Sequence, residues 1–228
     1  MFTKLLQQIN ISYNEKQLML LEQYFLLLKE WNKKMNLTAI IQRDEVYQKH
    51  FFDSLLLVKH IKLDQQSLCD VGTGAGFPGI VLKIFFSDLQ LFLVESSTKK
   101  CLFLNEVIKI LELENVTIIN ERVEDITDDY YEAFDIVTIR AVARLNIILE
   151  LCAGILKVKG TLIALKSNVS EEFKDAKNAM NFLGFSLKKS FESEWHFLGK
   201  RNILYFIKNK KTNKKYLRTF AQIKKSPL

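Results

Sequence analysis

Proline and cysteine are scarce in this chain of 228 residues, which holds two prolines and three cysteines. Because 48% of the residues are hydrophobic and so few are proline, the composition argues against long disordered linkers. Cys69, Cys101 and Cys152 lie far apart in apolar segments, whereas disulfide scaffolds and zinc sites use cysteines at close spacing. We therefore expect three buried thiols, no bound metal and a reducing compartment.

The sequence also lacks any apolar run long enough to cross a lipid bilayer. Its first eight residues contain neither the long apolar run nor the cleavage site of a signal peptide. We expect a cytoplasmic protein without a membrane-bound segment. The length is sufficient for one large domain with a substantial core, and we expect a monomer.

Acidic residues are missing from the last part of the chain. All 26 acidic residues lie before position 195, whereas ten of the 33 basic residues lie in 195–228, so this part carries the excess of positive charge. Two interpretations remain open, a solvated tail without a partner or a segment that binds a polyanion. Tyr216 and Phe220 offer aromatic faces on which bases stack, which favours RNA over a membrane surface.

Glycine is scarce too, yet four of the eight glycines lie between Gly72 and Gly79. The preceding run, 67–71, has the size and apolar character of a buried strand. The following run, 80–84, continues as a helix, and Pro78 suits its first turn. Because glycine lets a ligand approach the backbone closely, a strand, a glycine turn and a helix in this order predict a nucleotide-like ligand.

Three interpretations of the glycine turn are possible. Residues 74–79 satisfy the dinucleotide pattern G-x-G-x-x-G, and Glu95 suits a ribose hydroxyl, so an NAD-dependent oxidoreductase is one alternative. However, Asp70 precedes the first glycine and gives Asp-x-Gly-x-Gly-x-Gly, which resembles motif I of the S-adenosylmethionine-dependent methyltransferases. A tight turn that binds no ligand is the third interpretation.

Strand and helix patterns alternate after the glycine turn. The remaining strands are predicted at 90–94, 116–120, 135–140 and 160–166, and the helices at 99–111, 145–156 and 171–183, the last capped by Ser170. Short connections between them predict an α/β fold with a doubly wound, mostly parallel sheet. Strands at 186–191 and 202–208 leave no room for a helix between them, so we expect an antiparallel C-terminal hairpin. This hairpin is the methyltransferase arrangement and argues against a dinucleotide-binding domain.

Two amphipathic helices are predicted before the sheet. The first follows an N-cap at Asn14 and ends near residue 32, and the second covers about 43–61. On the second, His50 and Asp53 are three residues apart, so their side chains are close enough to hydrogen-bond. We divide the chain into an N-terminal helical extension (1–62), a cofactor-binding core (63–209) and a basic C-terminal tail (210–228).

Several motifs together resemble one known family, the bacterial small-subunit (16S) ribosomal RNA methyltransferase G family, also called glucose-inhibited division protein B. They are Asn36-Leu37-Thr38, His50-Phe51-Phe52-Asp53-Ser54, the stretch from Asp70 to Gly79 with its specific Gly-Phe-Pro-Gly ending, Lys99-Lys100, Arg140-Ala141 and Leu165-Lys166. The resemblance covers nearly the whole chain, but Tyr216-Leu217-Arg218 stands where the family commonly has Tyr-Pro-Arg. It implies a Rossmann-like class I methyltransferase fold, S-adenosylmethionine as cofactor, and methylation of N7 of a guanosine in 16S rRNA or the small ribosomal subunit.

The resemblance also implies cofactor contacts at residues that follow successive strands. These residues are Gly72, Phe77, Glu95, Ser96, Ser97, Val123, Glu124 and Arg140. Ligands of open α/β sheets bind at these carboxyl ends, so the positions are physically reasonable. We expect Glu95 to bind the ribose hydroxyls and Phe77 or Val123 to pack on adenine. Arg140 suits the cofactor's carboxylate or an RNA phosphate, with a structural ion pair as the alternative, and Glu124 has the alternative role of a helix-start acid.

The expected reaction needs no general base, because guanine N7 carries a lone pair and no hydrogen. Consistent with this, the sequence shows no Ser-His-Asp set, no paired carboxylates at catalytic spacing and no cysteine nucleophile motif. Besides the NAD-dependent enzyme, the alternatives are a methyltransferase of small molecules or proteins and a non-catalytic RNA-binding protein that keeps the fold.

Overall fold

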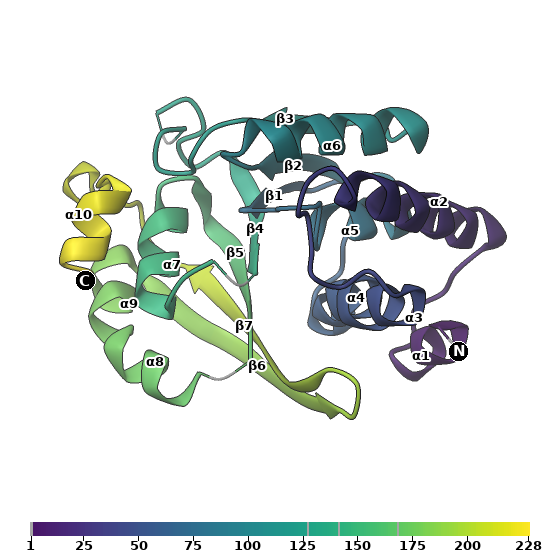
Figure 1. Cartoon of the computed structure of the whole chain (residues 1–228). Coiled ribbons are helices and arrows are strands. Elements are labelled where there is room, and N and C mark those ends of the chain that lie inside the picture. Colours follow the sequence, from purple (N-terminus) through teal and green to yellow (C-terminus); the bar gives the residue numbers. More distant parts are fainter. Residues whose placement is uncertain (1, 127, 141, 168) are drawn as a thin grey trace.

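The computed structural model describes residues 2–126, 128–140, 142–167 and 169–228, and Ala141 of the Arg140-Ala141 motif lies outside them. Within this part the strands form one sheet in the order β3-β2-β1-β4-β5-β7-β6 (Figure 1). The strands are β1 (Ser67–Val71), β2 (Gln90–Val94), β3 (Val116–Ile119), β4 (Phe134–Arg140), β5 (Leu156–Lys166), β6 (Phe185–Trp195) and β7 (Gly199–Lys208).

The pairing of the strands is the predicted one. Neighbours among β1 to β5 are parallel, whereas β7 is antiparallel to both β5 and β6. The chain runs outward from β1 through β2 to β3 and then returns to β4 on the other side of β1. The order therefore reverses between β1 and β4, and ligands of open α/β sheets bind at such a reversal.

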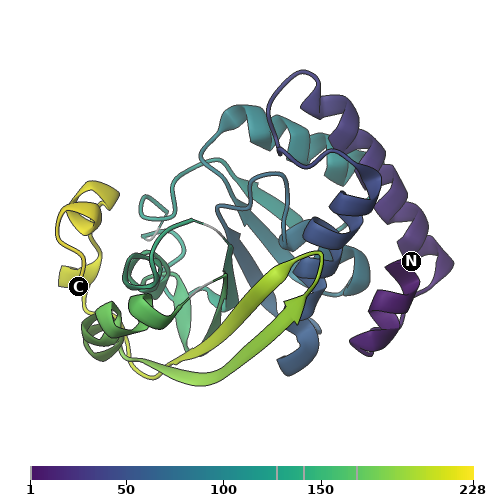
Figure 2. The same cartoon turned by 60° about the horizontal axis from the view of Figure 1, so that its bottom comes forward.

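Helices cover both faces of the sheet, and each face has its own apolar core. One core joins the N-terminal helices to α5 and α6, and the other joins the opposite face to α7, α9 and α10. The N-terminal helices and α10 lie at opposite ends of the molecule (Figure 2). The helices are α1 (Phe2–Gln8), α2 (Glu15–Asn32), α3 (Arg43–Val46), η1 (Tyr47–Phe52), α4 (Asp53–Leu55), η2 (Leu56–His60), α5 (Gly79–Phe85), α6 (Thr98–Ile110), α7 (Leu145–Ala153), α8 (Ser170–Asp175), α9 (Lys177–Leu183), η3 (Lys214–Tyr216) and α10 (Phe220–Lys225).

Of the two helices predicted before the sheet, the first begins where the sequence predicts, whereas the second has a different structure. Asn14 caps α2 as predicted, in a capping box with Gln17. The predicted helix over 43–61 is instead α3, a π-helical turn (η1), α4 and a 3-10 turn (η2). The wider π turn buries Tyr47, Phe51 and Phe52, and such turns often occur at functional sites.

Several later elements begin or end at other residues than the prediction gave. Helix α7 ends at Ala153 and β5 begins at Leu156, because Leu156 is fully buried and pairs with Phe134 of β4. The predicted helix over 171–183 is broken at the fully buried Ala176 into α8 and α9, and α8 begins at Ser170 after Val169 at the N-cap position. Alternation of apolar residues does not reveal such breaks, which depend on packing.

The basic C-terminal segment folds back on the sheet core, so it is not a solvated tail. Thr212 and Ile223 are buried, and Arg218 Nε donates to Glu150 Oε2 on α7 at 3.0 Å. The backbone N–H of Leu228 donates to the other oxygen of Glu150 at 2.8 Å. The segment therefore has a fixed position against α7.

The basic residues of 195–228 differ in their exposure, from the fully buried Lys208 at the end of β7 to the exposed lysines of the tail. Lys208 is fully buried; its ammonium group bonds to Glu132 at 2.9 Å and to the carbonyl oxygens of Ala153 and Leu156 at 2.7 and 2.8 Å. Exposed lysines of the tail are Lys210, Lys211, Lys214, Lys215, Lys224 and Lys225. The charge available to a polyanion therefore lies mainly on the surface around η3 and α10.

Membrane-spanning helices, metal-binding groups and the state of the cysteines can each be examined in the structure. In the described part of the chain, no helix is both long and apolar enough to cross a membrane. Among the same residues, no three His, Cys, Asp or Glu side chains are grouped so that they could hold a metal ion. The three cysteines are buried and unpaired, as predicted.

Candidate cofactor and substrate site

The glycine turn follows β1 at the point where the strand order reverses. Gly72, Gly74 and Gly76 have φ values of 65°, 62° and 94°, which side chains other than glycine rarely adopt. Asp70 is fully buried below the turn. It accepts hydrogen bonds from the Thr73 hydroxyl at 2.6 Å and from the Gly79 N–H at 2.9 Å. The carboxylate thus holds both ends of the turn together.

Burial raises the pKa of Asp70 to about 6, although the hydrogen bonds from Thr73, Gly79 and Thr138 act in the opposite direction. The Thr138 hydroxyl on β4 donates to the second carboxylate oxygen at 3.0 Å. Asp70 therefore joins the turn to both strands that flank the reversal point. Its oxygens are occupied by these donors, which indicates a structural role.

The N-terminal helix α2 supports the turn from below through Tyr24, which sequence reasoning missed. Tyr24 is fully buried, and its hydroxyl donates to the carbonyl oxygen of Ala75. A Cβ at Gly76 would lie 2.6 Å from the Tyr24 hydroxyl oxygen. Tyr24 and Phe25 of α2 are both core residues, and Tyr24 also fixes the backbone of the turn.

A small cavity opens beside the turn at the carboxyl ends of β1, β2 and β3, with a volume of about 130 Å³. Five of the eight predicted site residues line it, namely Gly72, Glu95, Ser96, Val123 and Glu124. Its other lining residues are Val71, Val94, Glu121, Arg122, Val142, Leu151 and Phe220. The sequence did not place Val142 or Phe220 beside the glycine turn, because these residues reach the cavity only through the fold.

Glu95 stands at the inner edge of this cavity. It is 7% exposed, and its oxygens accept hydrogen bonds from the N–H groups of Gly74 and Ser97 at 3.1 and 2.8 Å. Ser97 is the N-cap of α6, and its contribution is this backbone donor. Lys100 Nζ lies 3.5 Å from Oε2, the oxygen that already accepts from Gly74, so Oε1, with a further lone pair, is the better acceptor for a ligand hydroxyl.

The side chains around the cavity suit parts of a nucleoside. A Cβ at Gly72 would come within 2.8 Å of Val142 Cγ2, so glycine keeps the passage along the turn open. Val71, Val94, Val123, Val142 and Leu151 supply apolar contacts, whereas Glu95 supplies acceptors. The faces of a base match the apolar side chains, and a ribose with two hydroxyls matches the acceptors.

Phe77 lies elsewhere, in a place that does not suit the predicted packing on adenine. Its ring is 4% exposed and is stacked on His50 with the ring centroids 4.5 Å apart. The guanidinium of Arg140 lies 5.4 Å from the same ring. Phe77 therefore supports His50 and Arg140, and Val123 remains the candidate for contact with a base.

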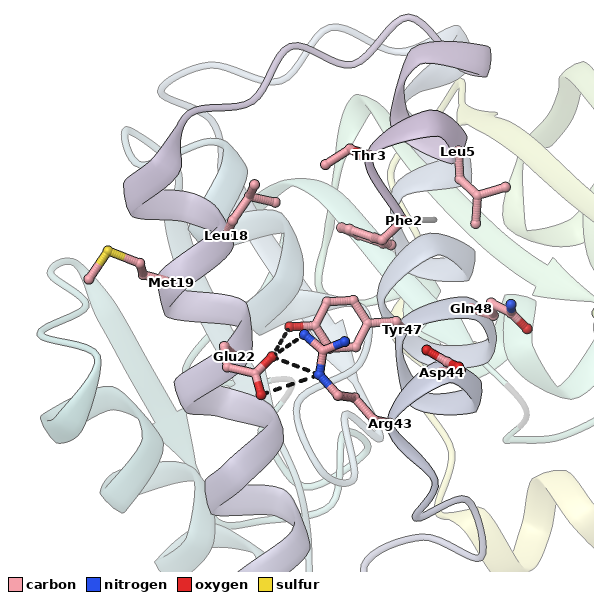
Figure 3. A pocket seen from close by; sticks show the side chains of 10 residues that line it. All are labelled: Phe2, Thr3, Leu5, Leu18, Met19, Glu22, Arg43, Asp44, Tyr47 and Gln48. Carbon is pink, nitrogen blue, oxygen red and sulfur yellow. Dashed lines mark hydrogen bonds and ion pairs between the residues drawn. The ribbon is translucent and has the colours of Figure 1, made fainter.

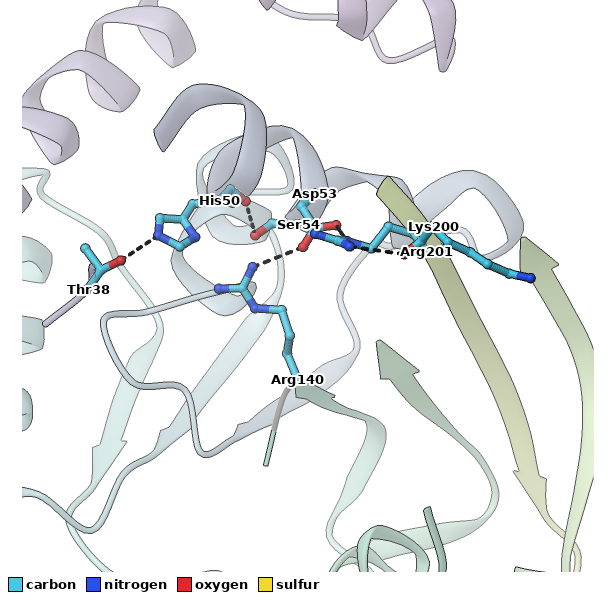
Figure 4. A network of polar contacts seen from close by, with 7 residues as sticks. All are labelled: Thr38, His50, Asp53, Ser54, Arg140, Lys200 and Arg201. Carbon is cyan, nitrogen blue, oxygen red and sulfur yellow. Dashed lines mark hydrogen bonds and ion pairs between the residues drawn. The ribbon is translucent and has the colours of Figure 1, made fainter. Parts of the chain in front are cut away.

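Arg140 lines a second and larger cavity of about 510 Å³. The other residues of its wall are Ile40, Lys49, His50, Asp53, Leu165, Lys166, Ser167, Glu172 and Arg201. Asp53 is 5% exposed and contacts two guanidinium groups, Arg140 Nη1 at 3.2 Å and Arg201 Nε at 2.9 Å (Figure 4). Two cations around one carboxylate leave this wall positively charged.

The predicted hydrogen bond between His50 and Asp53 is absent. Instead, His50 Nε2 lies 2.9 Å from the Thr38 hydroxyl oxygen (Figure 4), because the π turn and the Phe77 ring orient the imidazole away from Asp53. Burial, together with the charge of Arg140, lowers the pKa of His50 to about 3. His50 is therefore neutral and a poor proton acceptor.

Another cavity, of about 500 Å³, lies between α1, α2 and α3, away from the glycine turn. Its polar groups bond to one another: Glu22 accepts from the Tyr47 hydroxyl at 2.8 Å and from Arg43 Nε at 2.9 Å (Figure 3). These bonds stabilise the packing of α3 on α2. We assign this cavity no role in the reaction.

Comparison with known proteins identifies the family. The family model described as rRNA small subunit methyltransferase G matches residues 17–218. The proteins named ribosomal RNA small subunit methyltransferase G from Bacillus thuringiensis (strain Al Hakam) and Bacillus cereus (strain AH820) are each 43% identical over 232 residues, which covers 100% of this chain and 97% of each relative. The chain belongs to the rRNA small subunit methyltransferase G family. The resemblance seen in the sequence is confirmed, and with it the methyltransferase activity.

Solved structures agree on the fold of this family member. M. jannaschii TYW2 in complex with AdoMet is similar with a TM-score of 0.58 and 16% identity, covering 75% of this chain and 79% of that protein. Precorrin-6y C5,15-methyltransferase from Geobacter metallireducens is similar with a TM-score of 0.54 and 16% identity, covering 69% and 88%. The predicted Rossmann-like methyltransferase fold is confirmed. The family membership decides against the NAD-dependent oxidoreductase.

Proposed function

We propose that this protein transfers a methyl group from S-adenosylmethionine to N7 of a guanine in 16S rRNA. The observation that carries the proposal is that two cavities of different character open where the parallel strands end, one beside the glycine turn and one at the ends of β4 and β5. The first, lined by Gly72, Glu95 and Val123, offers acceptors and apolar contacts that suit a nucleoside. The other, lined by Arg140 and Arg201, is cationic, and Arg140 packs near Phe77 at the far end of the turn. A methyl donor and an anionic substrate would thus meet beside the turn.

At the cofactor end, Glu95 would accept hydrogen bonds from the ribose hydroxyls, while Val123 would contact the adenine ring. Ser96 and Glu124 line the same wall, and the Ser97 N–H fixes one oxygen of Glu95. S-adenosylmethionine, when bound, supplies a methyl group on a positively charged sulfur. Glu124 lies in a turn after β3 and belongs to no helix. This position favours a role at the cavity over the role of a helix-start acid.

At the substrate end, Arg140 and Arg201 would bind the guanine O6 or a nearby phosphate. A guanidinium has five N–H donors, so the bonds to Asp53 leave others for a ligand. Asp53 holds both groups in place as a positioning residue. Arg140 would thus combine the two predicted roles, because it is both an ion-pair partner and a wall of the substrate cavity.

The chemistry expected at this site is orientation of the two reactants, without proton removal. Guanine N7 has a free lone pair and needs no base to remove a proton. His50, the histidine drawn beside Arg140 in Figure 4, is neutral because its pKa is lowered. The rigid support of Phe77 by His50 and Tyr24 would keep Arg140 in a fixed position. Such positioning accounts for large rate gains when the reacting atoms are held in line.

The partner proposed for the exposed lysines around η3 and α10 is rRNA of the small subunit. Their charges are not neutralised by acidic residues of the segment, since 195–228 contains none. We also propose that the chain works as a monomer in the cytoplasm. The division into a helical extension (1–62), a core (63–209) and a tail (210–228) is retained as a functional one, in which the extension supports the turn and the tail faces RNA.

The experiment that tests this function uses small ribosomal subunits from cells that lack the protein. Incubation with the protein and labelled S-adenosylmethionine, followed by mapping, should place the label on N7 of a guanine in 16S rRNA. Label on another nitrogen would refute the proposed chemistry. Binding of S-adenosylhomocysteine without transfer to subunits would point to a non-catalytic RNA-binding protein, and transfer only to proteins or small molecules would refute the rRNA substrate.

A further inference from the structure

Phe220 of the C-terminal helix α10 lines the same cavity as Gly72, Glu95 and Val123. The strand-end residues were expected there because parallel strands end at a common edge. Phe220 comes from a segment about 100 residues further along the chain than Val123, and the sequence alone suggested that its ring stacks on RNA bases. Because Phe220 lines this cavity, its ring faces whatever ligand the cavity holds, which need not be an RNA base.

The position of Phe220 is fixed by its neighbours on both sides in the chain. Thr219 and Gln222 form a capping box at the start of α10, and Ile223 is 1% exposed within the core of the adjacent face. Arg218, two residues before Phe220, is bound to the buried Glu150. A ring held by such contacts is preorganised to bind a ligand at little entropic cost.

The surroundings of the ring suit a purine. The guanidinium of Arg122, on the loop after β3, lies 5.9 Å from the centroid of the Phe220 ring. The other apolar residues of the wall, among them Val123, Val142 and Leu151, are aliphatic. A wall that combines an aromatic ring with aliphatic side chains can bind a flat base by stacking and apolar contact.

We propose that Phe220 forms part of the adenine subsite for S-adenosylmethionine, so that the C-terminal helix is a component of the cofactor site. The proposal rests on the proposed function insofar as that cofactor occupies this cavity. It moves Phe220 from the RNA-binding surface, where the sequence placed it, to the wall of the cofactor pocket. The exposed lysines on either side of it remain available to RNA.

The test measures binding of S-adenosylhomocysteine and of 5′-methylthioadenosine to the full chain by calorimetry. Phe220→Ala should weaken both by about tenfold, because the base can no longer stack on an aromatic ring, whereas Phe220→Tyr should bind as the unchanged chain does. Phe182→Ala is the matched control: Phe182 is 48% exposed, its ring centroid lies 5.8 Å from that of Tyr216, and it does not line the cavity. Affinity for 16S rRNA should be the same in all of them.

Two results would overturn the proposal. One is unchanged affinity of Phe220→Ala for both nucleosides, and the other is a loss of rRNA affinity in its place. If circular dichroism shows that the alanine variant is unfolded, Phe220→Leu decides, because it keeps the apolar volume and removes the ring; affinity equal to that of the unchanged chain refutes the assignment. Failure of the unchanged chain to bind S-adenosylhomocysteine would instead refute the proposed function itself.

Discussion

Gly76 shows how a single residue determines whether the turn can form. Its φ of +94° is unfavourable for any side chain, and an added Cβ would lie 2.6 Å from both the Tyr24 hydroxyl and Ile80 Cγ1. Gly199 has a similar left-handed φ of +65°, but no atom lies within 4 Å of the added Cβ. The two glycines therefore separate the effect of backbone strain from that of space.

We predict that Gly76→Ala lowers the free energy of unfolding by about 3 kcal/mol or more, because strain and overpacking add. Gly199→Ala should cost about 1 kcal/mol, the penalty of a left-handed conformation alone. Urea unfolding of both variants measures the difference. Equal losses would show that the Tyr24 hydroxyl does not limit the space below the turn.

Asp70 makes the stability of the folded chain depend on pH. Its pKa in the folded chain is about 6, against a usual value of 3.8, so the folded state binds its proton more tightly than the unfolded state. Its contribution to stability is therefore greatest at low pH and is lost as the pH rises from about 4 through 6. Above this pH range, the buried negative charge of Asp70 lowers the free energy of unfolding.

We predict that Asp70→Asn, which stays uncharged, gains stability relative to the unchanged chain as the pH rises from 4 to 7. The expected gain is on the order of 3 kcal/mol, since the pKa of Asp70 is raised by about 2 and a pKa difference of 1 corresponds to about 1.36 kcal/mol. Urea unfolding of both chains at several pH values measures it. A difference that does not change with pH would mean that the hydrogen bonds from Thr73, Gly79 and Thr138 fully offset burial.

At the scale of elements, Asp53 connects three parts that are distant in sequence. It begins α4, and its carboxylate contacts Arg140 at the end of β4 and Arg201 on β7. In the same way, Tyr24 connects α2 to the glycine turn. The N-terminal helices therefore act on the site directly, by fixing the cationic wall and the turn.

We predict that Asp53→Asn lowers kcat/KM for methylation of small subunits by about tenfold or more, because the two guanidinium groups lose the charge that orients them. Affinity for S-adenosylhomocysteine should stay the same, which a general loss of folding would not allow. Asp175→Asn is the control, since Asp175 forms an exposed ion pair with Arg144 at 2.7 Å. Parallel losses of cofactor affinity and activity would show that Asp53 has only a structural role.

At the scale of the whole molecule, the C-terminal segment combines two properties. Its inner side is anchored on Glu150 of α7 and through Ile223, and its outer side carries the exposed lysines. Because the segment is fixed, those lysines have a defined direction relative to both cavities. A cationic surface of this kind attracts rRNA electrostatically, and the range of the attraction becomes shorter as the salt concentration rises.

We predict that replacing Lys214, Lys215, Lys224 and Lys225 by Gln weakens rRNA binding and makes it less sensitive to salt. The slope of log K against log salt should become shallower by about 0.7 for each phosphate that is no longer neutralised. Filter binding at several salt concentrations measures the slope. The control changes the same amount of charge at exposed lysines elsewhere: Lys16, Lys62, Lys109 and Lys177. An equal effect of the control would mean that only net charge matters.

Local patterns along the chain are enough to predict several parts of this protein. The glycine turn, the alternation of strands and helices, the antiparallel hairpin and the position of Glu95 after β2 all follow from spacing and apolar periodicity, and the family follows from the motifs. The neighbouring carboxyl ends of parallel strands then brought Gly72, Glu95 and Val123 to one cavity, because that edge is a property of the topology.

The packing of helices on the sheet determines which distant side chains complete the candidate site. The positions of Tyr24 under the turn, Asp53 between two arginines, Phe77 against His50 and Phe220 in the cavity beside the turn all depend on how the helices dock on the sheet. Such docking is a sum of many weak contacts between segments far apart in the chain, and no local pattern encodes it. For the same reason, the sequence left open whether the basic tail is solvated, and the structure shows it folded against α7.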